Sequence, residues 1–137
     1  MNAASAHATY LLTLLSLSVV LLLIHILLQG VSATKELGSA WNAGPRDEPR
    51  EPKGVVAGRA ARASRNFQET YPAFIGLLLA MILTGDTSGV GLFGGTVWLI
   101  ARILYIPLYL TGVPYIRSMV WVGSLVGLLI MMIGLFL

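Results

Sequence analysis

The sequence predicts an all-α membrane protein: a single domain over residues 1–137, folded as a bundle of four transmembrane helices. Hydrophobic residues make up 56% of the chain and charged residues only 11%. With a mean hydropathy of +0.81, the composition departs from that of soluble proteins toward that of membrane proteins. The apolar residues form four segments, which we compare with the roughly 20 residues that a spanning helix needs.

The first span is expected at about residues 9–30. A secretory signal peptide has a basic n-region and a shorter apolar core. This segment has neither feature, so we interpret it as a retained span. His25 and Gln29 lie one helical turn apart, a spacing that favours a buried hydrogen-bonding pair over a ligand site.

A cytoplasmic loop is expected at about residues 32–57. Its central stretch, WNAGPRDEPREPKG at 41–54, mixes proline, glycine and charges of both signs, which is typical of an irregular connector. Trp41 is interpreted as an anchor at the membrane interface. Charges of alternating sign without interleaved aromatic residues argue against nucleic-acid binding.

The second span is expected at about residues 58–84. Its strictly apolar part, residues 71–83, reaches membrane length only if the polar helix 59–70 continues into it. At 100° per residue, five polar side chains of that helix fall within roughly a third of its circumference. These residues are Arg59, Arg62, Arg65, Asn66 and Glu69. Because ionisable groups are costly in a bilayer, this polar stripe is expected to face protein or a polar cavity.

The third span is expected at about residues 91–111, and it carries a second polar stripe. One face holds Trp98, Arg102, Tyr105 and Tyr109. An arginine inside an apolar run needs a partner. Pro107 predicts a kink beside the tyrosines, as Pro72 does in the second span.

The fourth span is expected at about residues 115–137, and its polar groups lie where it begins. They are Tyr115, Arg117 and Ser118. The small-xxx-small pairs Gly91 with Gly95 and Gly123 with Gly127 indicate close helix contacts. The run GVGLFG at 89–94 matches a dinucleotide-binding pattern, but it opens a membrane span and so carries almost no weight.

The distribution of charge predicts the orientation. Four spans put both termini on one side of the membrane. Seven of the nine Lys and Arg residues lie between Lys35 and Arg65, whereas the 84–91 loop holds only Asp86. The positive-inside rule therefore places the first and third loops in the cytoplasm and both termini outside.

Polar groups from three spans are thus expected to meet near the cytoplasmic face. The candidate site comprises Arg62, Arg65, Asn66, Glu69, Tyr105, Tyr109, Arg117 and Ser118. The alternative is purely structural: Glu69 pairs with Arg65 or Arg102 to dock helices, the tyrosines are interfacial, and Arg117 follows the positive-inside rule.

The residue types indicate the chemistry of a ligand. Arginines outnumber carboxylates in the candidate site, which suits an anion bound through bidentate guanidinium contacts. The chain has no cysteine, so any thiol must come from a ligand. His7 and His25 lie apart from any carboxylate cluster, and no metal site is predicted.

Two segments resemble the MAPEG family, the membrane-associated proteins in eicosanoid and glutathione metabolism. The first is RAARASRNFQETYP at 59–72, with an R-A-x-x-N-x-x-E pattern, and the second is RILYIPLYLTGVPYIRSMVW at 102–121. The similarity covers essentially the whole chain and is closest to a bacterial-type member. It implies a homotrimer of four-helix subunits in the bacterial inner membrane, with glutathione as cosubstrate bound between neighbouring subunits.

By position, the resemblance assigns roles to the candidate residues. Arg62, Arg65, Asn66 and Glu69 match glutathione-holding residues of the family, and Tyr105 and Tyr109 match its aromatic pair. Arg117 and Ser118 match the Arg-Ser that lies by the thiol in members that activate it, so they are the expected catalytic residues. The chain departs from the family in lacking a basic residue within the first span and in having Trp121 where some relatives have tyrosine.

The resemblance implies a glutathione-dependent transferase or peroxidase acting on lipophilic electrophiles that arrive through membrane lipids. Whether the chain is an enzyme stays open, because the same polar groups suit a non-catalytic membrane protein in which they only stabilise the oligomer. A small transporter has less support, since no inverted repeat is present.

Overall fold

The computed structural model describes residues 3–137, and every regular element in that range is helical. The helices are α1 (Ala3–Leu37), α2 (Ser39–Ala43), α3 (Val55–Thr84), α4 (Val90–Thr111) and α5 (Ile116–Gly134). Within these described residues, four helices are long and apolar enough to cross a membrane, namely α1, α3, α4 and α5. The predicted all-α fold with four spanning helices is thereby confirmed.

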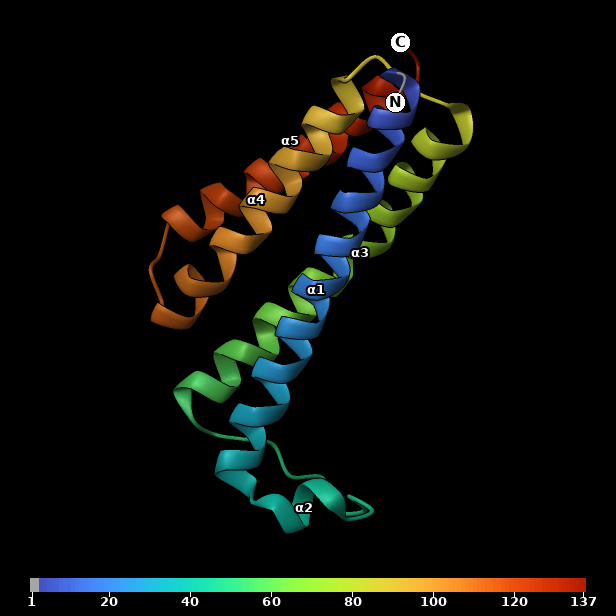
Figure 1. Cartoon of the computed structure of the whole chain (residues 1–137). Coiled ribbons are helices and arrows are strands. Elements are labelled where there is room, and N and C mark those ends of the chain that lie inside the picture. The colour runs from blue at the N-terminus through green and yellow to red at the C-terminus, as the bar shows by residue number, and fades with distance from the viewer. Residues whose placement is uncertain (1–2) are drawn as a thin grey trace.

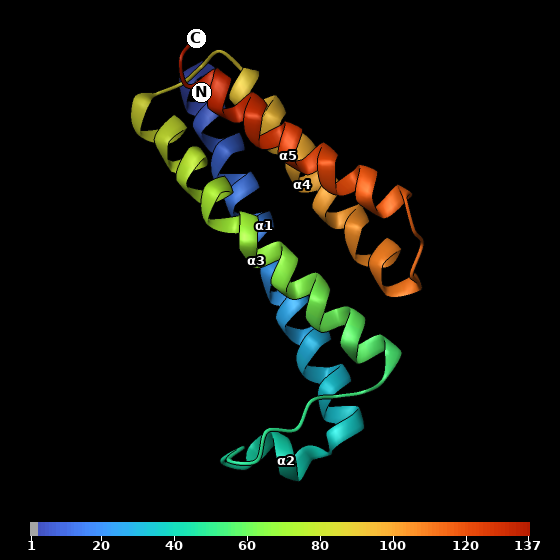
Figure 2. The same cartoon turned by 180° about the vertical axis from the view of Figure 1, so that it is seen from behind.

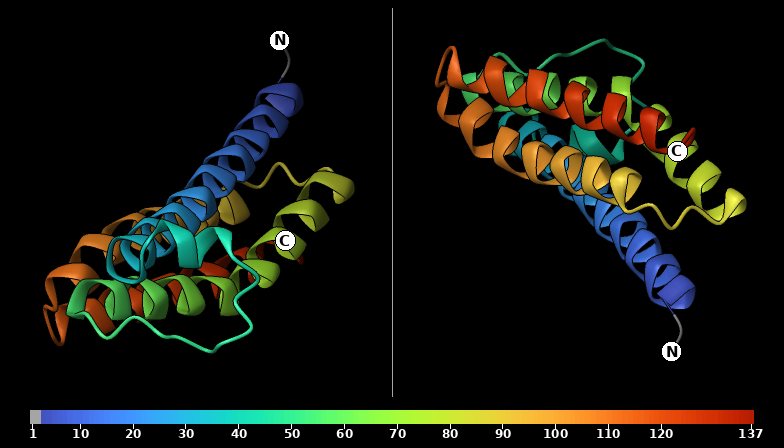
Figure 3. Two further views of the ribbon diagram at one scale, coloured as in Figure 1. Left: turned by 90° about the horizontal axis from the view of Figure 1, so that it is seen from below. Right: turned by 90° about the horizontal axis from the view of Figure 1, so that it is seen from above.

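The helices form two antiparallel pairs, α1 with α3 and α4 with α5. The pairs pack together where both termini lie, and they diverge toward the opposite end (Figures 1 and 2). At that opposite end the α1–α3 pair extends past the α4–α5 turn and carries α2 and its loop, as the views along the bundle also show (Figure 3). Both termini and the α3–α4 loop therefore share one end of the bundle.

The connection between α1 and α3 is more ordered than the expected loop of about 32–57. Helix α1 continues to Leu37, and the five-residue α2 follows. The Glu36 carboxylate then accepts hydrogen bonds from the backbone N–H of Lys53 at 2.5 Å and of Gly54 at 2.8 Å. Because the N-terminal amides of a helix lack partners and attract negative charge, Glu36 ties the end of α1 to the start of α3.

Neither proline ends its helix. Helices α3 and α4 continue through Pro72 and Pro107, both of which lie on exposed faces. Packing of neighbouring helices can keep a membrane helix continuous through a proline. The prolines therefore do not divide either helix, and the bend expected at each stays a prediction.

Aromatic rings from α3 and α4 form the centre of the core. Phe74 stacks on Trp98 with ring centroids 3.9 Å apart, and Phe67 lies 5.7 Å from the same indole. The His25 ring of α1 stacks on Phe67 at 4.7 Å. The predicted hydrogen bond between His25 and Gln29 is absent among the described residues, because the imidazole packs against α3 while Gln29 is exposed.

Glycines allow α4 and α5 to approach each other closely. A Cβ added at Gly127 would lie 2.8 Å from the carbonyl oxygen of Gly94 and 2.8 Å from the amide nitrogen of Trp98. A Cβ at Gly123, on the same helix, would meet nothing within 4 Å. Gly123 and Gly127 were both predicted to permit close helix packing, but only Gly127 lies against another helix of the same chain.

We predict that Gly127→Ala destabilises the fold by about 1–3 kcal/mol, because backbone atoms of α4 must shift to admit the methyl group. The matched control is Gly123→Ala, which adds the same group to the same helix in open space. It should leave stability unchanged or raise it by up to about 1 kcal/mol through helix propensity. Unfolding of the detergent-solubilised variants, followed by circular dichroism, measures both effects, and equal stability of the two would contradict the prediction.

Candidate functional site

Arg102 is the most deeply buried charged group among the described residues, with 1% of its surface exposed. It projects from α4 toward α3. There its Nη1 donates to Oδ1 of Asn66 at 2.8 Å and its Nη2 donates to Oγ1 of Thr70 at 2.5 Å. A charge within an apolar span is tolerated only where it is hydrogen-bonded in this way. These bonds therefore fix how α3 and α4 dock.

Aromatic rings enclose the same guanidinium. Its central carbon lies 5.9 Å from the ring centroid of Trp98 and 5.7 Å from that of Tyr105. At such distances the electron-rich ring faces attract a cation. The Nε atom of Arg102 is buried and has no hydrogen-bond partner among the described residues.

The polar contacts continue in both directions from Arg102. On α3, Nδ2 of Asn66 donates to Oε2 of Glu69 at 3.3 Å. On α4, the rings of Tyr105 and Tyr109 lie 5.3 Å apart, and the guanidinium of Arg117 from α5 lies 4.5 Å from the Tyr109 ring centroid. These residues form a continuous series of contacts across three helices, which we call the polar chain: Glu69, Asn66, Arg102, Tyr105, Tyr109 and Arg117.

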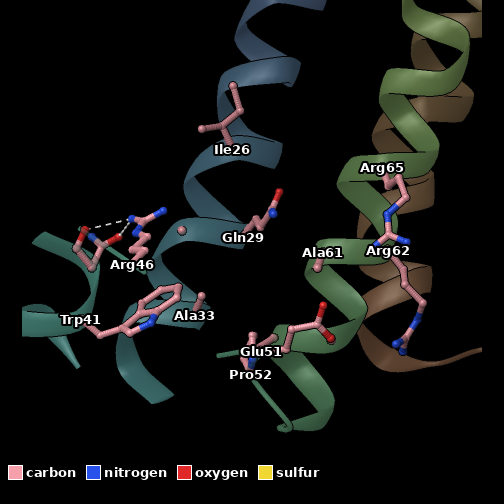
Figure 4. A pocket seen from close by; sticks show the side chains of 14 residues that line it. Ile26, Gln29, Ala33, Trp41, Arg46, Glu51, Pro52, Ala61, Arg62 and Arg65 are labelled. Carbon is pink, nitrogen blue, oxygen red and sulfur yellow. Dashed lines mark hydrogen bonds between the residues drawn. The ribbon is translucent and has the colours of Figure 1, made fainter. Parts of the chain in front are cut away.

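The polar chain contains five of the eight candidate residues from the sequence, and the other three lie elsewhere. Arg62 and Arg65 are exposed. They line a cavity of about 520 Å³ between α3, α1 and the connecting segment 38–54, which contains α2 and which we call the α2 loop (Figure 4). Ser118 is exposed at the start of α5. The third arginine of the stripe, Arg59, turns toward α4 and donates to the carbonyl oxygen of Leu110 at 2.9 Å.

The stripe of polar residues on α3 therefore has two faces. One face, with Arg59 and Asn66, docks on α4, whereas Arg62 and Arg65 face outward on the α1 side. Neither Arg62 nor Arg65 makes a hydrogen bond or ion pair within residues 3–137, where the one ion pair joins Arg50 to Glu48 at 2.9 Å. The outward face thus carries unpaired positive charge.

Arg102 and Thr70 were missed as candidate residues. The signal for Arg102 was its position as the lone arginine inside an apolar span, but the alternative reading gave it Glu69 as a partner. In the described residues Glu69 forms an ion pair with neither Arg102 nor Arg65. Asn66 lies between Glu69 and Arg102 and is hydrogen-bonded to both. A neutral amide was not an expected partner for a buried cation, and Thr70 gives no pattern of its own.

The arrangement offers positive groups that suit an anion and, on the same helix, a carboxylate that suits a cationic group. The outward arginines offer bidentate donors. Glu69 is exposed, and its carboxylate is oriented by the Asn66 amide, whose oxygen is committed to Arg102. A zwitterionic ligand with more negative than positive charge suits this set of groups.

We predict that Asn66→Ala lowers the free energy of unfolding by about 1.5–3 kcal/mol, because the buried Arg102 guanidinium loses a charge-assisted hydrogen bond. Asn66→Asp keeps an acceptor for Arg102 and should cost less than Asn66→Ala. Gln29→Ala, which removes an exposed amide with no hydrogen-bond partner among the described residues, serves as the control and should resemble the unmodified chain. Thermal unfolding without ligand tests the ranking, and a loss for Asn66→Ala no larger than that for Gln29→Ala would show that Arg102 does not depend on this bond.

Comparison with known proteins places the chain in a family. The family model described as MAPEG family matches residues 11–137, nearly the whole chain. Neither the curated proteins nor the solved structures contain a match. Because the family model covers the four apolar helices and both halves of the polar chain, this protein is an integral membrane protein and belongs to the MAPEG family.

Proposed function

We propose that this protein is a glutathione-dependent membrane transferase or peroxidase that acts on lipophilic electrophiles. The observation that carries the proposal is the polar chain, which joins an exposed carboxylate on α3 to an arginine on α5 through buried groups of α4. The family includes glutathione-using transferases, and a series of polar contacts through membrane-length helices is expensive unless it has a use.

The groups on α3 fit the charges of glutathione. This tripeptide carries carboxylates at both ends, an amino group beside one of them, and a thiol. Arg62 and Arg65 have unpaired guanidiniums that suit the carboxylates, and Glu69 suits the amino group. Asn66 holds the Glu69 carboxylate in place, and Tyr105 and Tyr109 complete the proposed binding surface.

Arg117 and Ser118 are the proposed catalytic residues. A free thiol with a pKa of about 8.5 is mostly protonated at neutral pH, and each unit by which that pKa falls corresponds to about 1.4 kcal/mol of preference for the thiolate. The Arg117 guanidinium, held over the Tyr109 ring, would supply that preference through its charge. The Ser118 hydroxyl would donate a hydrogen bond to the sulfur.

The electrophile in this proposal arrives through the bilayer and is therefore lipophilic. The helices offer it an extensive apolar surface, because many large hydrophobic side chains of α1, α4 and α5 are exposed. The thiolate would attack it near Arg117, where the polar chain reaches α5.

One observation favours a non-catalytic alternative. The bonds from Arg102 to Asn66 and Thr70 join α3 to α4 within one chain, so they stabilise the fold whether or not a ligand binds. In that alternative, Arg62, Arg65 and Glu69 meet groups of a neighbouring subunit and only hold the oligomer together.

Substitutions on α3 and α5 should separate binding from catalysis. Arg62→Ala and Glu69→Ala should each weaken glutathione binding by about 1.5–3 kcal/mol, because each removes a charge-assisted contact. Arg117→Ala should leave binding nearly unchanged but abolish the ultraviolet absorbance of the thiolate, together with conjugation or peroxidase activity. Calorimetry and difference spectra of the detergent-solubilised protein provide the two readouts.

Two results would contradict these assignments in different ways. A thiolate signal in Arg117→Ala equal to that of the unmodified protein removes the catalytic role of Arg117, even with binding intact. Unchanged glutathione binding in all three variants, together with dissociation of the oligomer, supports the non-catalytic alternative.

A homotrimer is the proposed assembly. Arg62, Arg65 and Glu69 are exposed on a membrane-length helix, and lipid cannot satisfy such groups. Neighbouring subunits would cover them and complete the glutathione site. Native mass spectrometry in mild detergent should therefore give three times the 14.7 kDa chain mass, and a monomer that still binds glutathione would exclude this assembly.

The proposed orientation places the α2 end in the cytoplasm and both termini outside, in a bacterial inner membrane. The basic residues of the α1–α3 connection and of the start of α3 support it through the positive-inside rule. A reporter that is active only outside the cytoplasm should be active when fused to the C-terminus. Activity of a cytoplasm-only reporter at that position would reverse the orientation.

A further inference from the structure

The α2 loop contributes a third arginine to the cavity that Arg62 and Arg65 line. The cavity has α1 on one side and α3 on another, and the loop residues Trp41, Asn42 and Arg46 form a further wall. In Figure 4, Arg46 and Trp41 lie across the cavity from Arg62 and Arg65, with Gln29 of α1 between them. The described residues that line the cavity include three arginines and one carboxylate, that of Glu51.

The Arg46 side chain is held in place by its own loop. Its Nη2 donates to the carbonyl oxygen of Asn42 at 3.0 Å and also to Oδ1 of Asn42. Its guanidinium lies 4.8 Å from the ring centroid of Trp41, within the range of cation–π attraction. Because guanidinium has five N–H donors, the Nε and Nη1 atoms, which have no partner among the described residues, remain available to a ligand.

The backbone is also specialised at this position. Arg46 has a φ of 58°, in the left-handed region that side chains other than glycine rarely adopt. The bonds to Asn42 and the contact with Trp41 accompany this conformation. The far end of the loop is tied back to α1, where the Glu36 carboxylate accepts from the backbone N–H of Lys53 and of Gly54.

We propose that Arg46 is a ligand-binding residue that completes, with Arg62 and Arg65, a site for the carboxylate groups of an anionic substrate. The inference rests on the proposed function in that the substrate is glutathione. It adds that the α2 loop forms a wall of the substrate site and selects for negative charge. A preorganised guanidinium suits this role, since little side-chain freedom is lost when the anion binds.

Arg50 provides a matched control on the same loop. It carries the same charge and is exposed, but it pairs with Glu48 at 2.9 Å and does not line the cavity. Removal of either arginine changes the net charge equally. A larger loss of affinity in Arg46→Ala than in Arg50→Ala would therefore come from the place of Arg46 in the cavity and not from the loss of a positive charge alone.

The test is calorimetric titration of the full-length protein in mild detergent with two probes, glutathione and the thiol-free carboxylate citrate. Arg46→Ala should weaken binding of both probes by roughly ten- to a hundredfold, the equivalent of one lost charge-assisted contact. Arg50→Ala should stay within about twofold of the unmodified protein, which is the scale of a screened surface charge. Arg46→Gly, which adopts a positive φ without strain, should weaken binding as much as Arg46→Ala.

Each other outcome decides a specific point. Unchanged affinity in Arg46→Ala, equal losses in Arg46→Ala and Arg50→Ala, or retained affinity in Arg46→Gly each overturns the role of Arg46. Citrate binding that depends on Arg46, in a protein that does not bind glutathione, supports the role of Arg46 and overturns the proposed function. A protein that binds neither probe overturns both.

Discussion

The structure depends on how one positive charge is accommodated inside an apolar helix. Arg102 is buried where α4 meets α3. Among the described residues it contacts no carboxylate but an amide, a hydroxyl and two aromatic rings. Those partners exist only if α3 and α4 pack in one register, because Asn66 and Thr70 are one turn apart on the facing side of α3. The register that gives Arg102 its hydrogen bonds also determines where Glu69 and Tyr105 lie. The packing of α3 on α4 therefore also forms the candidate site.

Much of this fold was predictable because hydropathy and helical periodicity are local properties. The four spans follow from apolar length, and the grouping of Asn66 with Glu69 follows from the 100° step along one helix. The partner of Arg102 was harder to predict. The choice between Glu69 and Asn66 depends on the rotation of α3 relative to α4, which no single segment encodes. The division of the polar stripe between Arg59 and Arg62 has the same origin, since it reflects which side α1 occupies.

The loop between α1 and α3 shows another limit of sequence reasoning. Its proline, glycine and mixed charges correctly indicate an irregular backbone, and that composition by itself suggests no function. Arg46 is held by Asn42 and Trp41 of α2, and the cavity that it lines also needs α1 and the start of α3, which meet only in the folded chain. Composition describes an average over such a segment, whereas a binding residue is defined by one fixed arrangement.

The unequal lengths of the helices have a consequence for where the arginine-lined cavity lies. Helix α5 has 19 residues, which at 1.5 Å per residue gives about 28 Å, close to the roughly 30 Å hydrocarbon core of a bilayer. Helix α1 has 35 residues, or about 52 Å by the same rise, so it protrudes from a membrane that α5 just crosses. The arginine-lined cavity is formed by the C-terminal part of α1, the start of α3 and α2 with its loop, at the end of the bundle that protrudes. In the proposed reaction, the charged peptide would therefore approach at this protruding end, whereas the apolar reactant would approach Arg117 from the lipid.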